Sequence, residues 1–143
     1  MRIKEKLQGT ERVLKRIKEK NLEVPIIVEG KKDVQALREL GFKGRIIKIK
    51  TSRTVFRIIE SLRETDDEVI ILTDWDRAGS RLFYRIKRAC KANTLSFNPG
   101  LRKQLIKYTK TDIKDVESLP VFLKRLRKII KNPYNSRNKR RKP

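Results

Sequence analysis

Three carboxylate side chains follow two short apolar runs, and their placement favours metal chemistry. Glu29 comes directly after residues 24–28, and Asp74 and Asp76 come directly after residues 69–73. Both runs are rich in β-branched residues, as strands buried on both faces of a parallel sheet are. In such sheets function gathers at the carboxyl ends of the strands. Mg²⁺ takes one or two carboxylates together with substrate phosphates, so the sequence predicts a metal site at this edge.

The spacing within this group sets its expected geometry. Asp74 and Asp76 are two residues apart, which in an extended chain directs both carboxylates to one side and Trp75 to the other. Such a pair could hold one divalent ion, and the fold must bring Glu29 to it. Asp33 lies one helical turn beyond Glu29, where it could act at the site or simply cap a helix.

Several neighbouring residues have structural explanations. Asp66 and Asp67 precede a strand rather than follow one, so we expect a solvated turn. Trp75 is interpreted as a core residue or a lid over the site more readily than as a platform for a nucleic-acid base. Thr51 and Ser52 close one strand and open a helix, which leaves capping and phosphate contact as alternatives.

The charge of the chain indicates a polyanionic partner. Its 143 residues, enough for one domain, include 39 Lys and Arg against 17 Asp and Glu, a net charge of +22. Residues 1–76 hold 18 basic and 14 acidic side chains, whereas residues 77–143 hold 21 and 3. Residues 77–111 contain no acidic side chain. The binding surface for nucleic acid is therefore expected mainly on the second half.

Composition also excludes several classes of function. The chain has no histidine, which excludes zinc fingers and histidine-based acid–base catalysis, and its one cysteine, Cys90, cannot form an internal disulfide. No apolar run approaches the roughly 18–20 residues of a membrane-spanning helix, and no signal-peptide pattern is present. We therefore expect a cytoplasmic protein without a membrane partner. The abundance of charged residues is typical of thermophiles.

The elements that must position the carboxylates alternate in type. Apolar periodicity predicts a helix over residues 1–21, with Thr10 as a helix N-cap, and further helices opened by Asp33, by Ser52 and by Gly79. The alternation predicts an α/β fold with an about four-stranded, mainly parallel sheet flanked by helices. The expected strands are residues 24–28, 46–49, 69–73 and 94–97, and two more helices are expected over residues 101–108 and 119–131.

Two motifs resemble those of the Toprim (topoisomerase–primase) domain family. The first reads Val28-Glu29-Gly30-Lys31-Lys32-Asp33, and the second reads Thr73-Asp74-Trp75-Asp76-Arg77-Ala78-Gly79. Each follows an apolar strand and precedes a helix, and the two occur in the family's order. The resemblance covers about residues 24–97 and continues weakly into residues 112–119. The small stand-alone archaeal Toprim proteins and the Toprim ribonuclease that matures bacterial 5S ribosomal RNA look most similar.

The resemblance implies a Rossmann-like Toprim fold and Mg²⁺-dependent chemistry on phosphodiesters, with Mn²⁺ as a substitute. It implies that Glu29 is the catalytic proton carrier, and that Asp74 and Asp76 bind the metal together with Glu29. Ser80 stands where topoisomerases often have a glutamate, so strand passage is not expected. The positions near these motifs that are expected to contact substrate phosphate are Gly30, Lys31, Lys32, Asp33, Thr51, Arg77, Gly79 and Arg81.

Two functions from different classes agree with these features. The first is a metal-dependent endonuclease acting on structured RNA, preferred over DNA because a small domain with basic extensions suits folded RNA. The second is a non-catalytic RNA-binding or ribosome-associated module, for which Glu29 would be dispensable. Either could have a ribosomal or RNA-processing protein partner. The expected organisation is a helical extension (1–22), the Toprim domain with its C-terminal helices (23–131) and a basic disordered tail (132–143).

Overall fold

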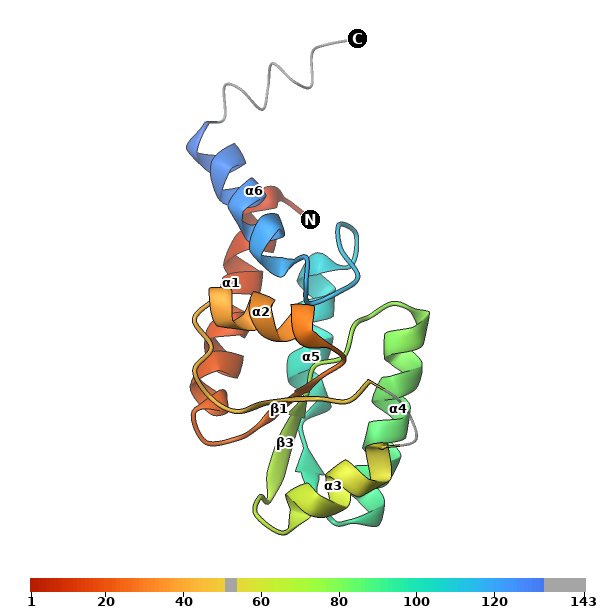
Figure 1. The fold of residues 1–143 in the computed structure, drawn as a ribbon. Coiled ribbons are helices and arrows are strands. Elements are labelled where there is room, and N and C mark those ends of the chain that lie inside the picture. Colours follow the sequence, from red (N-terminus) through yellow and green to blue (C-terminus); the bar gives the residue numbers. More distant parts are fainter. Residues whose placement is uncertain (51–53, 133–143) are drawn as a thin grey trace.

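The computed structural model describes residues 1–50 and 54–132 and has a parallel sheet between two layers of helices (Figure 1). The elements alternate as the sequence predicts. In chain order they are α1 (Ile3–Asn21), β1 (Ile26–Val28), α2 (Lys31–Glu39), β2 (Ile46–Lys48), α3 (Val55–Arg63), β3 (Glu68–Ile71), α4 (Arg77–Ala92), β4 (Ser96–Phe97), α5 (Pro99–Thr109) and α6 (Leu119–Lys131).

The order of the strands places β1 and β3 at the centre of the sheet. The order is β2-β1-β3-β4, and every pair is parallel. Ile26 of β1 lies opposite Ile46 of β2 on one side and Ile70 of β3 on the other. The chain therefore leaves β1 first toward one edge and then returns to the other. In open α/β sheets, ligands bind beyond the carboxyl ends of the strands at such a change of direction.

The sheet separates two apolar cores. Alternate residues of a strand point to opposite faces, and the packing follows that rule. Ile26 and Ile70 pack with helices α1, α2, α5 and α6, whereas Ile27 and Ile71 pack with α3 and α4. Cys90 lies fully buried in the second core, as expected for a packing residue. The two central strands are thus buried on both faces, which explains their nearly continuous apolar sequences.

Helix α1 is part of the larger core. It packs against α5 and α6, and its buried side chains include Leu14 and Ile17. The expectation that Thr10 caps a helix is wrong, because α1 runs through this position without a break and Thr10 is fully buried. Its hydroxyl has no hydrogen-bond partner among the described residues. The helix has no need of a cap at Thr10, because it already begins at Ile3 and its buried face starts with Leu7.

Helices α2 and α4 begin earlier than the sequence predicts. Helix α2 starts at Lys31 rather than near Asp33, and α4 starts at Arg77 rather than at Gly79. Gly41 follows the C-cap of α2 and has a φ of +90°, a conformation that glycine adopts readily. Within the described residues, no helix combines the length and the apolar character needed to cross a membrane.

Candidate active site at the carboxyl ends of β1 and β3

The glutamate of the first motif contacts the aspartate of the second. Glu29 follows β1 directly, and its Oε1 accepts a hydrogen bond from the backbone N–H of Asp74 at 3.3 Å. Leu72 continues the ladder beyond β3, since its N–H donates to the Ile27 carbonyl at 2.8 Å. Residues 45 positions apart in the chain therefore meet at the change of direction of the sheet. The fold therefore brings Glu29 to Asp74, as the sequence analysis expects.

A loop after α5 closes over the second motif. The backbone N–H of Val116 donates to Asp74 Oδ1 at 3.1 Å. Trp75 donates from its backbone N–H to the Lys114 carbonyl and from its indole Nε1 to the Ile113 carbonyl, each at 2.9 Å. Trp75 is also partly buried against the larger core. These contacts fit the interpretation of Trp75 as a lid or core residue, since its one polar atom is occupied by the protein.

Asp76 has a structural role in addition to its predicted one. It is the N-cap of α4, and its Oδ1 accepts the backbone N–H of Gly79 at 2.7 Å. Asp74 and Asp76 thus bind backbone groups on different segments, unlike the paired arrangement expected for an extended chain. In residues 1–50 and 54–132, no group of three or more Asp, Glu and Cys side chains is arranged to hold a metal ion. The three-carboxylate ligand set stays a prediction.

Crowding changes the acidity of these carboxyl groups. Burial, followed by the charges of Asp33, Glu29 and Asp115, raises the pKa of Asp74 to about 7. The pKa of Glu29 is also raised, first by burial and then by the charges of Asp76 and Asp33. A carboxyl group with a pKa of about 7, such as that of Asp74, can exchange protons at physiological pH, and a bound cation would relieve the repulsion between the neighbouring charges.

Asp33 supports the backbone of the first motif. It is the third residue of α2, and its Oδ2 accepts the backbone N–H of Gly30 at 3.0 Å. Only 6% of the residue is exposed, and burial, then the charges of Glu117 and Asp115, raise its pKa. Asp33 could act at the site or support a helix end, and this geometry favours the structural role. The residue lies in the first turn of α2 and not at the N-cap position, where the sequence analysis places it.

Arg102 is a site residue that the sequence reasoning missed. This residue of α5 is only 8% exposed, and it donates from Nε to the Thr73 carbonyl at 3.0 Å and from a terminal nitrogen to the Asp74 carbonyl at 2.7 Å. Its guanidinium also lies over the Phe83 ring, 4.6 Å from the centroid. Arg102 therefore places a positive charge against the backbone that carries Asp74. Its sequence neighbours carry no signal, since Lys103 beside it is an ordinary exposed cation.

The two glycines of the motifs differ in their surroundings. Gly79 is buried, and a Cβ there would overlap the Asp74 carbonyl oxygen and lie 2.8 Å from Glu29 Oε1. A Cβ added at Gly30 would have nothing within 4 Å of it. Gly79 is therefore required by the close approach of the two motifs themselves. The space beside Gly30 is open to a ligand.

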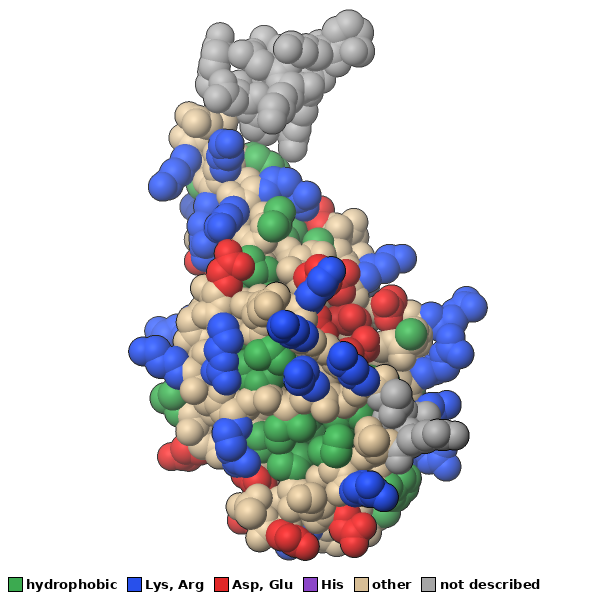
Figure 2. Space-filling model, in the orientation of Figure 1, with side chains coloured by type: hydrophobic (Ala, Val, Ile, Leu, Met, Phe, Trp, Pro, Cys, Tyr) green, Lys and Arg blue, Asp and Glu red, His purple; other side chains and the backbone are tan. Residues whose placement is uncertain are grey.

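Basic side chains surround the acidic centre. Figure 2 shows acidic side chains gathered near the start of α2 and α4, with basic ones around them. Lys31, Lys32, Arg77 and Arg81 are all exposed at these helix starts. Lys32 lies 3.9 Å from Glu117, as a loose exposed pair. Thr51 lies outside the described residues. Phosphate contacts by these positions stay predictions.

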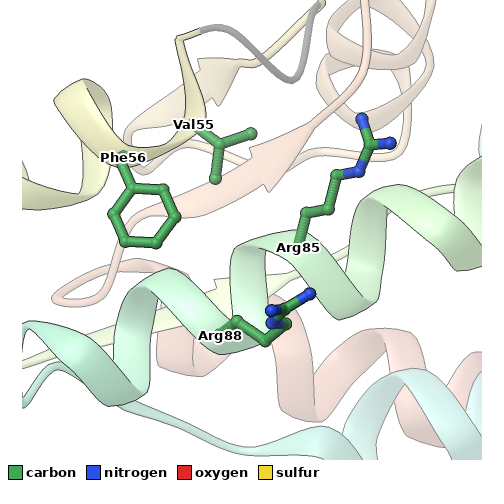
Figure 3. A pocket seen from close by; sticks show the side chains of 4 residues that line it. All are labelled: Val55, Phe56, Arg85 and Arg88. Carbon is green, nitrogen blue, oxygen red and sulfur yellow. The ribbon is translucent and has the colours of Figure 1, made fainter.

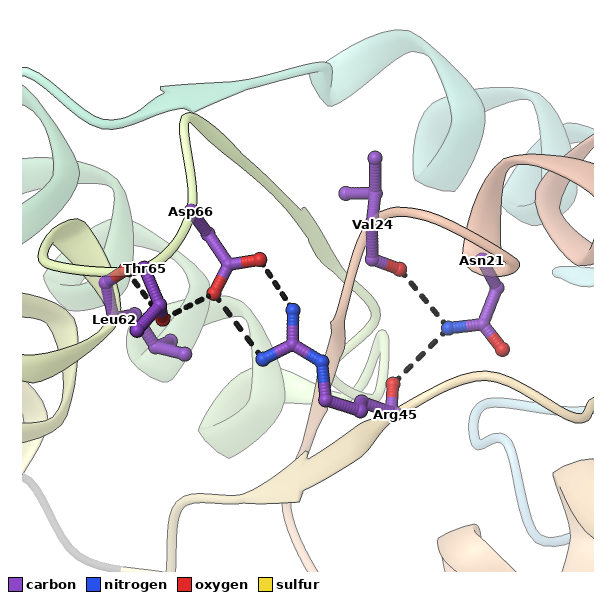
Figure 4. Close-up of polar contacts among 6 residues, drawn as sticks. All are labelled: Asn21, Val24, Arg45, Leu62, Thr65 and Asp66. Carbon is purple, nitrogen blue, oxygen red and sulfur yellow. Dashed lines mark hydrogen bonds and ion pairs between the residues drawn. The ribbon is translucent and has the colours of Figure 1, made fainter.

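Asp66 and Asp67 lie away from the site, before β3, as expected. Asp66 accepts hydrogen bonds from both terminal nitrogens of Arg45 and from the Thr65 hydroxyl (Figure 4). This pairing lowers the pKa of Asp66. Asp67 is exposed and lies 3.3 Å from Arg63. The sequence predicts a solvated turn here. In the structure, the ion pair between Arg45 and Asp66 also holds the turn in place.

The residues present fit a hard divalent cation. The donor atoms at the centre are all oxygens, and burial together with the neighbouring negative charges raises the pKa values of Asp74 and Glu29. Mg²⁺ needs only one or two carboxylates and keeps several waters or phosphate oxygens, so a closed cage of three is not required. The donor chemistry excludes a site for soft metals, because no cysteine or histidine is present there.

Comparisons with known proteins agree with this geometry. The model of the Toprim domain family matches residues 24–117. A UPF0292 protein of Methanosarcina barkeri is 37% identical over 112 residues, covering 78% of this chain and 76% of the relative. A UPF0292 protein of Methanocaldococcus jannaschii is 37% identical over 107 residues, covering 75% and 84%.

A solved structure supports the same fold. It is that of a protein from Aquifex aeolicus with a TM-score of 0.64 and 24% identity, and the match covers 76% of this chain and 95% of that one. Toprim domains generally bind a divalent metal such as Mg²⁺ and process nucleic acid. The chain belongs to the Toprim domain family, and UPF0292 proteins of archaea are among its relatives.

Proposed function

We propose that the protein is a Mg²⁺-dependent endonuclease that acts on structured RNA. The observation that carries the proposal is the hydrogen bond from the Asp74 N–H to Glu29 Oε1 at 3.3 Å. It sets a proton-carrying group beside the carboxylate with the most strongly raised pKa of the described acids. The excess of basic over acidic side chains in residues 77–143 supports a nucleic-acid substrate.

The chain's own residues supply most of the proposed chemistry. Asp74, with Glu29 and Asp76, would hold the metal, which when bound stabilises negative charge on phosphoryl oxygens. Glu29, with its raised pKa, carries the proton that leaves the attacking water or reaches the leaving oxygen. Arg102 fixes the carbonyl of Asp74 and so the position of its side chain.

The phosphate would lie where donors and cations are exposed. The starts of α2 and α4 point to the same edge of the sheet, and helix N-termini attract anions. Lys31 and Arg77, exposed at these two starts, would orient the strand. The Toprim ribonuclease that matures 5S ribosomal RNA is the guide to the substrate class. A cytoplasmic location and an RNA-processing protein partner stay predictions.

The substitution Glu29→Gln tests the proposal. It keeps the size of the side chain and its ability to accept the Asp74 N–H, but it removes the proton and the charge. Single-turnover cleavage of a substrate mapped from total cellular RNA with Mg²⁺ should slow by about 10²–10⁴-fold. Affinity measured in Ca²⁺ should change little. Glu39→Gln, on the exposed face of α2, is the matched control and should cleave normally. Cleavage by the Glu29 variant at the wild-type rate contradicts the proposal.

The second candidate is a non-catalytic RNA-binding module. It is favoured by the excess of basic over acidic side chains in residues 77–143, which supports RNA binding whether or not cleavage follows. This candidate predicts RNA affinity that is equal with and without Mg²⁺. It also predicts no new RNA ends after incubation with Mg²⁺ or Mn²⁺. Absence of cleavage on both RNA and DNA would select it.

A further inference from the structure

A pocket lies between α3 and α4, away from the carboxylates. It has a volume of about 300 Å³, and the described residues that line it are Val55, Phe56, Arg85 and Arg88 (Figure 3). Phe56 is 55% exposed, whereas Val55 is buried. The pocket therefore combines an accessible aromatic ring with two guanidinium groups. Pockets of this size suit a small planar ligand.

The two arginines of the pocket belong to a line along α4. Arg77, Arg81, Arg85 and Arg88 follow one another at spacings of four, four and three residues, which places them on one face of the helix. All four are exposed, and no carboxylate of the described residues lies within ion-pair distance of them. Such a line of cations complements a chain of phosphates.

The line begins at the candidate active site. Asp76 caps the start of α4, and Arg77 is its first residue. At a rise of about 1.5 Å per residue, Arg85 and Arg88 lie about 12–17 Å farther along the helix. With a rise of about 3.4 Å per stacked nucleotide, this distance corresponds to roughly four nucleotides.

We infer that the pocket holds one unpaired base of a nucleic-acid strand whose backbone runs along α4 from the carboxylates. Phe56 stacks on the base, and Arg85 and Arg88 bind the phosphates on either side. Aromatic stacking within a basic groove is the usual way of binding single strands without base-specific hydrogen bonds. The inference deepens the proposed function by adding a substrate subsite, and it needs binding alone, not cleavage.

The test separates base contacts from phosphate contacts. Affinity is measured without divalent metal for a labelled oligoadenylate RNA and for a fully abasic phosphodiester strand of equal length. Phe56→Ala should weaken binding of the intact strand about 5- to 100-fold and leave the abasic strand unaffected. Phe56→Trp should retain the affinity. Arg85→Ala should weaken both strands and lower the salt slope by about one.

Controls are available on the same two helices. Tyr84→Ala removes an exposed aromatic of α4 that does not line the pocket, and it should not discriminate between the two strands. Arg63→Ala removes an arginine at the far end of α3 and should leave both affinities unchanged. Circular dichroism checks that each variant folds. We expect Phe56→Ala to fold, because the Phe56 side chain is largely exposed.

Several results would overturn the inference. Equal loss for both strands in Phe56→Ala, or no loss for either, removes the base from the pocket. Displacement of Phe56-dependent binding by adenosine monophosphate at far lower concentration than by the strand would assign the pocket to a free nucleotide. The binding assay contains no divalent metal and does not measure cleavage, so its results do not depend on the proposed catalytic role of Glu29. Failed cleavage with intact base discrimination would refute the nuclease alone.

Discussion

The guanidinium of Arg102 donates to the main-chain carbonyl of Asp74 at 2.7 Å, so that a buried cation fixes the backbone that carries the central carboxylate. The same side chain binds the Thr73 carbonyl and lies over the Phe83 ring. Burial lowers the pKa of Arg102, whereas the charge of Asp74 opposes that shift. Arginine stays protonated in proteins despite such a shift. Arg102 therefore provides a positive charge that partly balances the negative charges of Asp74 and Glu29.

Replacing Arg102 should therefore destabilise the fold and the site together. Arg102→Met keeps an apolar stem but leaves two carbonyls without their donor. We expect a loss of about 2–3 kcal/mol in the free energy of unfolding, measured in urea. Lys103→Met, at the exposed neighbouring position, is the control and should change it by less than about 0.5 kcal/mol. Equal effects would remove the special role of Arg102.

Alanine should destabilise the protein at one of the two motif glycines and not at the other. Gly79→Ala ought to stabilise an isolated helix, yet its Cβ would overlap the Asp74 carbonyl oxygen, so we expect a net loss of about 1–3 kcal/mol. Gly30→Ala meets nothing within 4 Å and should unfold as the wild type does. If substrate occupies that space, Gly30→Ala will instead lower RNA affinity. Chemical denaturation and RNA titration of the two variants separate these effects.

Acidity at Asp74 predicts how stability depends on pH. Its folded-state pKa of about 7 exceeds the ordinary value of 3.8, so the folded protein binds more protons between these pH values. This contribution to stability is complete below about pH 4 and is lost as pH rises through 7. Asp74→Asn has no proton to lose but can still accept the Val116 N–H. Without metal, the wild type should therefore lose stability relative to Asp74→Asn as the pH rises. Urea unfolding of both proteins at several pH values measures this difference.

Magnesium should reverse that loss. A bound divalent ion favours the ionised carboxylates, so Mg²⁺ should raise the melting temperature of the wild type above about pH 7 and do so less below about pH 6. Asp74→Asn should respond weakly. Asp67→Asn is a better control than a change at Asp66, whose ion pair with Arg45 supports the fold. A wild-type response in Asp74→Asn would remove Asp74 from the metal site.

The basic C-terminal residues should contribute to affinity. Removing residues 133–143 deletes five Lys and Arg side chains. Each of them that binds a phosphate should, when deleted, reduce the slope of log affinity against log salt by about 0.7–0.9. Filter binding at several salt concentrations measures this slope. A truncated protein with an unchanged slope would show that these residues do not contact RNA.

The sequence predicted the α/β alternation well because the two central strands are buried on both faces and their runs are apolar throughout. It also predicted that Glu29 and Asp74 meet, since the two motifs follow parallel strands. It did not predict the start of α4, although Asp76 three residues before Gly79 is a standard capping pattern. The predicted helix begins two residues too late, since the motif explains Asp76 as a metal ligand and leaves its capping role out.

Other parts of the site left no signal in the sequence. Val116 contributes a backbone N–H, which every residue other than proline possesses, so its side chain says nothing about the contact. Arg102 is one of many arginines, and only the tertiary structure buries it. The resemblance to the Toprim family continues only weakly into residues 112–119, and it does not predict that this segment closes over Asp74.

The position of Trp75 has a practical consequence for experiment. It is the one tryptophan of the chain, it stands between Asp74 and Asp76, and its indole N–H is bound by the Ile113 carbonyl. Its fluorescence therefore originates from the second motif alone, and the emission of an indole changes when its polar surroundings change. Binding of an ion, or release of the loop at Ile113, should be visible as a spectral shift in the unlabelled protein.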